Sequence, residues 1–288
     1  MKTHKIRFDP TKAFQIDLVG AGGNGSQMLG GLARLNMALI ALGYEGFNVN
    51  LYDADIVSMA NVGRQLFSVS DVGQYKSIVL IHRINMFYGT SWYAAPENYS
   101  RNNNHASIVI GCVDTKAARR SIHAIAQRSS LYWLDLGNRA TDGQVVLGQP
   151  VGKGTPPRVR ENMMASKDRL PTVLELFPEM ANKKSKEDNT PSCSLAEALE
   201  KQDLFINQSL ATFALNLLWQ LLRHKEIDHH GYFVNLKSGR VAPIPCDPLA
   251  WERIAGVASR RTASLDKLTP WQRRSLHMKP KTAKRKTP

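Results

Sequence analysis

The fold is decided by the stretch FQIDLVGAGGNGSQMLGGLARLNMALIALG, residues 14–43. Its first six residues form a short apolar run, typical of a buried strand. The run leads directly into GAGGNG, residues 20–25, whose glycines permit a tight turn and close backbone approach. Apolar residues then recur at the spacing of one helix face: Met28, Leu29, Leu32, Leu35, Leu39 and Leu42. A strand, a glycine turn and a helix in this order predict the opening of a doubly wound α/β fold.

The same alternation of strands and helices continues along the chain. FNVNLY, residues 47–52, predicts a second strand that ends at Asp53. Later segments predict helices over 77–87 and 116–128 and strands over 106–112, 130–136 and 143–148.

The second half of the chain predicts a core helix and a hairpin. Residues 208–223 are apolar on nearly all sides, as expected of a buried helix. Residues 232–236 and 240–244 flank a short turn and predict an antiparallel pair at the sheet edge. The fold class expected is therefore α/β, with a Rossmann-like, doubly wound, mostly parallel sheet and antiparallel edge strands.

Composition excludes several classes of protein. The 288 residues are 43% hydrophobic, which is typical of a globular protein and not of a disordered or fibrous one. No apolar run reaches the roughly twenty residues of a membrane span, and residues 1–10 lack the apolar core of a secretory signal. We therefore expect a cytoplasmic protein with no membrane contact. Three cysteines are too few for a disulfide framework or a four-cysteine zinc site.

The positive charge is concentrated at the end of the chain. The formal net charge is +14, and ten Lys or Arg residues follow Ser259, against the single acid Asp266. Because residues 278–288 contain no large apolar side chain except Met278, residues 259–288 are expected to be a basic, disordered tail. Two interpretations remain open: an arm that contacts nucleic acid or an acidic partner, and a solvated tail that aids solubility.

The glycine turn and the carboxylate after the second strand predict a nucleotide site. Gly20, Gly22, Gly23 and Gly25 precede a helix whose free N–H groups can bind a phosphate. Asp53 ends the next strand, where a carboxylate can accept a hydrogen bond from a ribose hydroxyl or cap a turn. It lies 33 residues after Gly20, whereas the dinucleotide fingerprint has an offset of about 20. This offset argues against a nicotinamide-dependent oxidoreductase.

The most specific pattern is DADIVSMANVGRQLF, residues 53–67, followed by DVGQYK, residues 71–76. It resembles the DxDxVxxSNLxRQxLF…DVGxxK signature of the ThiF/MoeB and ubiquitin-activating superfamily, which adenylates the C-terminal carboxylate of ubiquitin-like proteins. CVDTKAAR, residues 112–119, is similar to the turn after the next strand of that family. The resemblance runs from about residue 16 to 244. Within the family, the chain looks most like the ThiF-related protein of the bacterial PRTRC cassette of ParB-related and ThiF-related genes.

The resemblance implies ATP as the nucleotide and Mg²⁺ as its ion. It assigns these roles: Asp53 binds the ribose, Asn61, Arg64 and Lys76 contact phosphates, Asp114 coordinates Mg²⁺, and Asp55 and Gln65 belong to the nucleotide site, Asp55 for ribose or loop geometry. These residue types suit adenylation, because charge develops on phosphate oxygens when pyrophosphate leaves. Other interpretations remain open, since Arg64 and Lys76 could be surface charges and Asp114 could cap a helix.

Residues 153–190 interrupt the alternation and are similar to the crossover loop of the family, so we expect them to extend over the site. TPSC, residues 190–193, is similar to the segment ahead of the last large helix. Near a helix N-terminus, the Cys193 thiol could accept the acyl group as a thioester, and a structural role for it remains open. Cys112 is expected to pack as a small apolar residue.

The resemblance also implies an organisation and partners. Residues 1–258 are expected to form a ThiF-type adenylation domain that works as a homodimer on a small β-grasp protein ending in Gly-Gly. The paired CxxC motifs of MoeB-like proteins are missing, so no zinc is expected. The chain departs from the signature at Ala60, Gly63 and Thr115. The alternative is a catalytically degenerate nucleotide-binding scaffold or docking protein.

Overall fold

The computed structural model describes residues 2–100, 106–129, 131–150, 169–181, 196, 199 and 201–256. The predicted basic tail lies outside these residues, and so do most of the predicted loop over 153–190 and Cys193.

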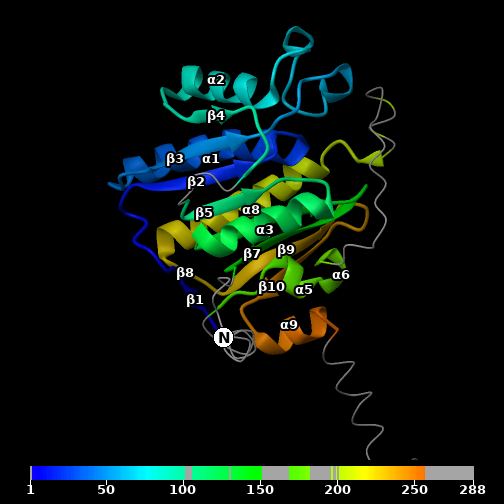
Figure 1. Cartoon of the computed structure of the whole chain (residues 1–288). Helices are drawn as coiled ribbons and strands as arrows, with labels where there is room; N and C mark the ends of the chain where they lie inside the picture. Colours follow the sequence, from blue (N-terminus) through cyan, green and yellow to red (C-terminus); the bar gives the residue numbers. More distant parts are fainter. Residues whose placement is uncertain are drawn as a thin grey trace, which may run out of the picture.

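An eight-stranded sheet runs through the molecule (Figure 1). Five neighbouring strands are parallel, in the order β4 (Tyr93–Ala95), β3 (Phe47–Tyr52), β2 (Phe14–Val19), β5 (Ile108–Gly111) and β6 (Tyr132–Asn138). Antiparallel strands continue the sheet beyond β6, in the order β7 (Asp142–Gly148), β9 (His229–Asn235) and β10 (Arg240–Pro245). Two short strands, β1 (His4–Lys5) and β8 (Glu226–Ile227), pair with each other apart from this sheet.

Helices cover both faces of the sheet. On one face, α1 (Gly23–Ala41) packs against α8 (Ile206–His224) and α2 (Lys76–Tyr88). On the other face, α3 (Lys116–Ser129) packs against β5 and β6, with α5 (Val173–Leu176) and α6 (Pro178–Ala181) beside it. Figure 1 shows α3 in front of the sheet and α8 behind it. The remaining helices are short: η1 (Met59–Asn61), η2 (Val69–Asp71) and α9 (Pro248–Ile254).

The predicted α/β fold is confirmed. The first two strands match the prediction to the residue, and the later helices and strands match within three residues. The hairpin of β9 and β10 lies at the sheet edge, as expected. Strands β1, β4 and β8 were not predicted, because two or three residues are too few to show an alternating pattern. Among the described helices, none combines the length and hydropathy that a membrane span requires.

The order of the parallel strands creates a crevice. The chain passes from β2 outward to β3 and β4 and then returns to β5 on the other side of β2. The connections after β2 and β5 therefore leave on opposite faces of the sheet. In such sheets, ligands bind at the carboxyl ends of the strands where the order reverses.

The turn between β2 and α1 has no room for side chains. Gly20 has a φ of +95°, and a Cβ there would lie 2.5 Å from the carbonyl oxygen of Cys112 at the end of β5. A Cβ on Gly25 would lie 1.8 Å from the carbonyl oxygen of Gly20. Glycine at these two positions lets the first turn of α1 rest directly on the strand end.

The outer edge strand, β10, is irregular. It contains Pro243 and Pro245, and its register with β9 shifts between Ile244 and Pro245. Proline lacks a backbone N–H and is tolerated in sheets chiefly on edge strands.

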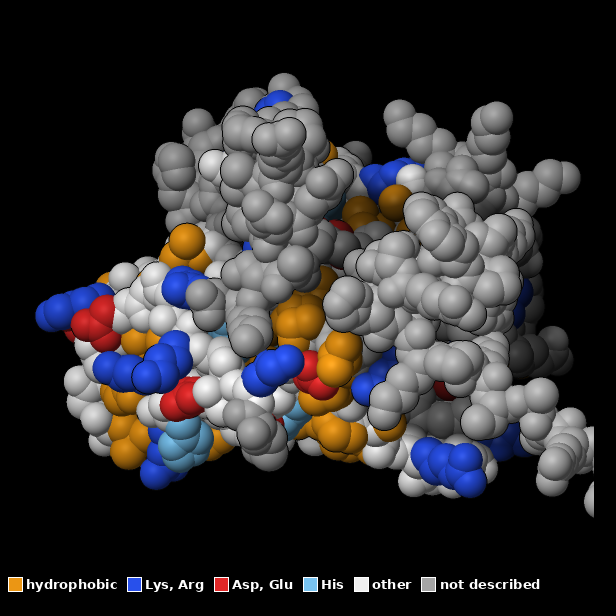
Figure 2. All heavy atoms as spheres, turned by 90° about the horizontal axis from the view of Figure 1, so that it is seen from below, with side chains coloured by type: hydrophobic (Ala, Val, Ile, Leu, Met, Phe, Trp, Pro, Cys, Tyr) orange, Lys and Arg blue, Asp and Glu red, His pale blue; other side chains and the backbone are white. Residues whose placement is uncertain are grey.

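A buried histidine lies at the end of the sheet opposite the crevice. The His230 side chain donates through Nδ1 to the Leu147 carbonyl oxygen at 2.7 Å, and its ring meets Trp251 edge-on. Burial, which is the largest cause, together with nearby His4 and His229 lowers the pKa of His230 to about 4, although the bond to Leu147 acts in the opposite direction. Figure 2 views the molecule from below, the side on which α9 and β10 lie in Figure 1, and basic, acidic and hydrophobic side chains are mixed on the described surface there.

Substitution of Gly25 tests the packing of the turn. Gly25→Ala should destabilise the fold by about 1–3 kcal/mol, because the new methyl group collides with the Gly20 carbonyl. The control is Gly30→Ala in the same helix, where no atom lies within 4 Å of the added Cβ. Replacing this helical glycine should raise the free energy of unfolding by about 0.5–1 kcal/mol. Urea unfolding followed by circular dichroism measures both, and equal stabilities would contradict the packing described.

His230 should make the fold acid-sensitive. The pKa of His230 is about 4 in the folded chain, below its ordinary value of 6.5. Between pH 4 and 6.5, therefore, the unfolded chain binds a proton at His230 and the folded chain does not. Its contribution to stability is thus fully present above pH 6.5 and is lost as the pH falls towards 4, by about 3 kcal/mol. Urea unfolding at several pH values should show this slope, and His230→Gln should flatten it. An unchanged slope in the variant would assign the effect to other groups.

Candidate functional site

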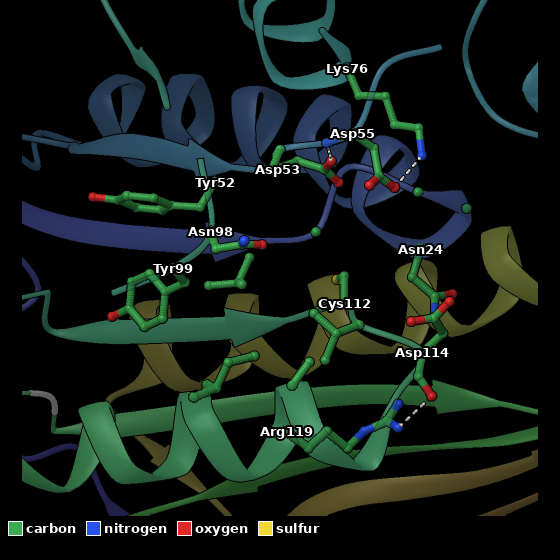
Figure 3. A pocket seen from close by; sticks show the side chains of 18 of the residues that line it. Asn24, Tyr52, Asp53, Asp55, Lys76, Asn98, Tyr99, Cys112, Asp114 and Arg119 are labelled. Carbon is green, nitrogen blue, oxygen red and sulfur yellow. Dashed lines mark hydrogen bonds and ion pairs between the residues drawn. The ribbon is translucent and has the colours of Figure 1, made fainter. Parts of the chain in front are cut away.

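A cavity of about 520 Å³ opens at the carboxyl ends of β2, β3 and β5. Figure 3 shows side chains between Asn24 and Arg119 converging on it, and Gln202 and Asn207 from the second half of the chain line it as well. Its lining includes ten of the residues singled out in the sequence: Gly20, Gly22, Gly23, Asp53, Asp55, Arg64, Gln65, Lys76, Cys112 and Asp114.

The glycine turn forms one wall of the cavity. The Gly20 N–H donates to the Tyr52 carbonyl oxygen at 2.8 Å, which ties the turn to the end of β3. Gly22 occupies the N-cap of α1, and no side-chain cap bond is found there in the described structure. The first N–H groups of this 19-residue helix are therefore available to an anion in the cavity. Gly25 does not line the cavity and serves the packing of the turn.

Asp53 holds the turn in place. Its carboxylate accepts hydrogen bonds from the Ala21 N–H at 2.6 Å and the Asp55 N–H at 2.8 Å. Burial raises the pKa of the Asp53 carboxyl above its ordinary value, although the Ala21 N–H and Lys76 act in the opposite direction. The turn-capping interpretation of Asp53 therefore applies, and the residue borders the cavity as well.

Lys76 presents a buried ammonium group to the same cavity. Its Nζ lies 2.8 Å from Asp55 Oδ2, and its side chain is only 9% exposed, whereas that of Asp55 is 71% exposed. Figure 3 shows both side chains on the upper side of the cavity. A buried lysine that borders a cavity is not an ordinary surface charge.

Arg64 is also partly withdrawn from solvent. Its Nη1 donates to Gln202 Oε1 at 2.7 Å, and burial lowers the pKa of the guanidinium. Arg64 Nε and Gln65 Oε1 are buried and have no hydrogen-bond partner within the described structure. Unpaired buried polar atoms are costly, and these two belong to residues that line the cavity.

Asn61 is not brought to the cavity. Its side-chain oxygen accepts from the backbone N–H of Ser58 at 2.9 Å and from the Ser58 hydroxyl at 3.1 Å, in a capping box around η1. The predicted contact of Asn61 with phosphate therefore has no support from its position and remains a prediction.

Asp114 follows β5 at the opposite wall from the glycine turn. The cap of α3 is provided by its neighbour, because Thr115 Oγ1 accepts from the Ala118 N–H at 3.1 Å. The Asp114 carboxylate is therefore not needed as that cap, and its side chain is exposed to the cavity.

An internal ion pair supports the Asp114 wall. Arg119 Nε lies 3.1 Å from Asp135 Oδ1, both side chains are buried, and Arg119 Nη1 donates to the Asp114 carbonyl oxygen at 3.2 Å (Figure 3). Burial raises the pKa of the Asp135 carboxyl, although Arg119 opposes the rise. Burial likewise raises the pKa of the Cys112 thiol, which fits its predicted role as a small packing residue.

Sequence reasoning missed several residues of the cavity. Asn24 in α1 donates to Asn138 Oδ1 at 3.1 Å, and its own Oδ1 is buried without a described partner. Asn207 in α8 fills the space beside Gly23, where a Cβ would lie 2.4 Å from its Nδ2. The only signal for Asn207 in the sequence was an asparagine within an otherwise apolar helix. Glu97, Asn98 and Tyr99, which follow β4, complete the wall.

A metal or acyl-acceptor site is less defined. The described residues include no group of three or more His, Cys, Asp or Glu side chains placed to hold a metal ion. Cys193, the predicted thiol nucleophile, lies outside the described residues.

The chain was compared with known proteins and structures. It is 28% identical over 145 residues to the ubiquitin-activating enzyme E1-like protein of Saccharomyces cerevisiae, a match that covers 48% of this chain and 21% of the yeast protein. The crystal structure of selenomethionine PaaA is similar with a TM-score of 0.51 at 15% identity, covering 81% of this chain and 64% of PaaA. Escherichia coli MccB with ATP has a TM-score of 0.49 at 15% identity, covering 83% and 65%.

These similarities differ in how much they establish about the chain. The resemblance to PaaA concerns the fold alone. The chain spans about a fifth of the yeast relative and less than two thirds of PaaA. The model of the ThiF family, in contrast, matches residues 9–246, which include the whole eight-stranded sheet and the cavity. On this match the chain belongs to the ThiF family.

Proposed function

We propose that the protein is an ATP-dependent adenylyltransferase that activates the C-terminal carboxylate of a small ubiquitin-like protein. The observation that carries this proposal is the composition of one cavity. A helix N-terminus and a glycine turn form one wall, and the half-buried Arg64, the buried Lys76 and the carboxylates Asp53 and Asp114 surround the space. Donors that bind phosphates and acceptors that bind a ribose and a cation thus face the same space.

The cavity has a natural orientation for ATP. Phosphates would lie at the glycine turn, where the N–H groups of α1 and the two cations supply positive charge. The ribose would lie beside Asp53 at the end of β3, since a carboxylate at that position can accept from a ribose hydroxyl. Asn24, Arg64, Gln65 and Asn207 line the same cavity and add polar side chains to the proposed site.

The reaction is a displacement at phosphorus. An oxygen of the partner's C-terminal carboxylate forms a bond to the α-phosphorus, and the bond from that phosphorus to the bridging oxygen breaks. The products are an acyl adenylate and pyrophosphate. Negative charge grows on the leaving pyrophosphate, and Arg64 and Lys76 would stabilise it.

Asp114 would hold a magnesium ion together with the phosphates. One exposed carboxylate is sufficient here, because Mg²⁺ is usually bound by one or two carboxylates with substrate phosphates and water. Such an ion, when bound, neutralises charge on the phosphate oxygens.

The identity of the partner is supported by similarity. The yeast relative is described as ubiquitin-activating enzyme E1-like, and we carry over from it the class of substrate, a ubiquitin-like protein. The sequence resemblance to the superfamily adds that this partner is a small β-grasp protein ending in Gly-Gly. A homodimer, a thioester on Cys193, a cytoplasmic location and membership of the PRTRC cassette belong to the same proposal.

Pyrophosphate exchange tests the function directly. The protein is incubated with ATP, Mg²⁺, labelled pyrophosphate and a candidate partner, a small β-grasp protein ending in Gly-Gly. Label should enter ATP only when the intact Gly-Gly terminus is present. Calorimetry should show binding of ATP and not of NAD. Tight NAD binding without ATP binding would refute the proposal, whereas ATP binding without exchange would favour the degenerate scaffold.

Arg64 and Lys76 should act mainly on the chemical step. Arg64→Ala and Lys76→Ala should each slow exchange at saturating ATP by about a hundredfold, since such a donor is most effective as charge develops. The control is Arg240→Ala at the exposed start of β10, which should exchange like the wild type. Wild-type exchange by both site variants would mean that these cations are not part of the reaction.

Asp53 should act mainly on affinity. A ribose contact is made equally before and during the reaction, so Asp53→Ala should raise the dissociation constant of ATP more than it lowers kcat. The lost bond to the Ala21 N–H loosens the phosphate-binding turn and adds to the same effect. Calorimetry and exchange at saturating ATP measure the two quantities. A variant with normal ATP affinity would contradict the placement of the ribose.

A further inference from the structure

Asp17 is a buried carboxylate in the middle of β2, a strand covered on both faces. The side chain is fully buried, and its register partner in β3 is Asn50. Asn50 Nδ2 donates to Asp17 Oδ1 at 3.1 Å. Burying a carboxylate is costly unless it is well hydrogen-bonded, so an acid here requires a structural or functional reason. The proposed adenylation does not use it.

The second bond of Asp17 connects it to the cavity wall. The Tyr99 hydroxyl donates to Asp17 Oδ2 at 3.2 Å, and the Tyr99 ring packs edge-on against Tyr52 with centroids 5.0 Å apart. Tyr99 follows β4 in a segment without regular secondary structure, where it is buried between the exposed Asn98 and Ser100. Its side chain is therefore an anchor that joins this segment to the sheet.

The anchored segment faces one end of the cavity. Figure 3 shows Tyr52, Asn98 and Tyr99 together at this end, and the Asn98 amide points into the open space. The opposite end holds Asn24, together with Lys76 and Asp114, which are proposed to contact phosphate and Mg²⁺. With the ribose at Asp53 between the two ends, the nucleotide base falls beside Asn98.

We infer that Asp17 and Tyr99 are positioning residues for the base of the nucleotide. Their hydrogen bond holds the segment after β4 so that the Asn98 amide meets the edge of the base. This inference rests on the proposed ATP site, and it concerns only the end of that site away from the phosphates. The contact is made equally in the ground and transition states, so it acts on affinity and not on the chemical step.

Tyr99→Phe tests the anchor, because it keeps the ring and removes the hydroxyl. Isothermal titration calorimetry is performed with ATP and, separately, with inorganic tripolyphosphate, which has no base. The variant should bind ATP about threefold to tenfold more weakly. This is the value of one neutral hydrogen bond, here the contact of the Asn98 amide with the base. Its affinity for tripolyphosphate should not change. Tyr93→Phe, at an exposed tyrosine of β4, is the control and should match the wild type with both ligands.

A double-mutant cycle connects the anchor to Asn98. Asn98→Ala should also weaken ATP binding and spare tripolyphosphate, and the double variant should be hardly weaker than Asn98→Ala alone, because both changes remove the same contact. Equal weakening for ATP and tripolyphosphate in Tyr99→Phe would show a general loss of structure and overturn the inference. Unchanged ATP affinity would also overturn it. Wild-type protein that binds no ATP would refute the proposed function together with this inference.

Discussion

The structure depends on one steric constraint, the absence of side chains where β2, β5 and α1 meet. Gly20 lies against the Cys112 carbonyl, and Gly25 lies against the Gly20 carbonyl, so backbone touches backbone at both points. This contact brings the start of α1 to the carboxyl ends of the parallel strands. A larger residue at either position would move the helix away from the strands, and the cavity would lose the wall on which an anion can be bound.

Much of the fold and part of the site could be predicted from the sequence, because their signals are local. The run over 14–25 combines an apolar strand with glycines, and the pattern over 53–76 lies within one connection of the sheet. Local signals also have limits, as Asn61 shows. The side-chain oxygen of Asn61 accepts a hydrogen bond from Ser58, three residues earlier. A sequence match cannot reveal that this local bond competes with a contact to a ligand.

The remainder of the site depends on contacts between distant segments. Arg64 meets Gln202 across 138 residues of sequence, and Tyr99 reaches Asp17 across 82. No periodicity predicts such pairs, since the first depends on where the segment before α8 lies and the second on the order of the strands in the sheet. Asp17 itself looks like an irregularity within an apolar strand until its described donors, Asn50 and Tyr99, are seen. Polar residues that interrupt an otherwise apolar element are therefore the places where sequence reasoning is least complete.

The irregular edge strand limits how a partner's chain terminus can be held. Many proteins bind an extended peptide by adding it as a further strand to an open sheet edge. Here β10 contains two prolines and a register shift, and β4 at the other edge has only three residues. Neither edge is a good template for another strand. Under the proposed function, a partner's C-terminal tail would therefore be held by side chains and loops at the strand ends. The same two edges also protect the sheet from edge-to-edge aggregation.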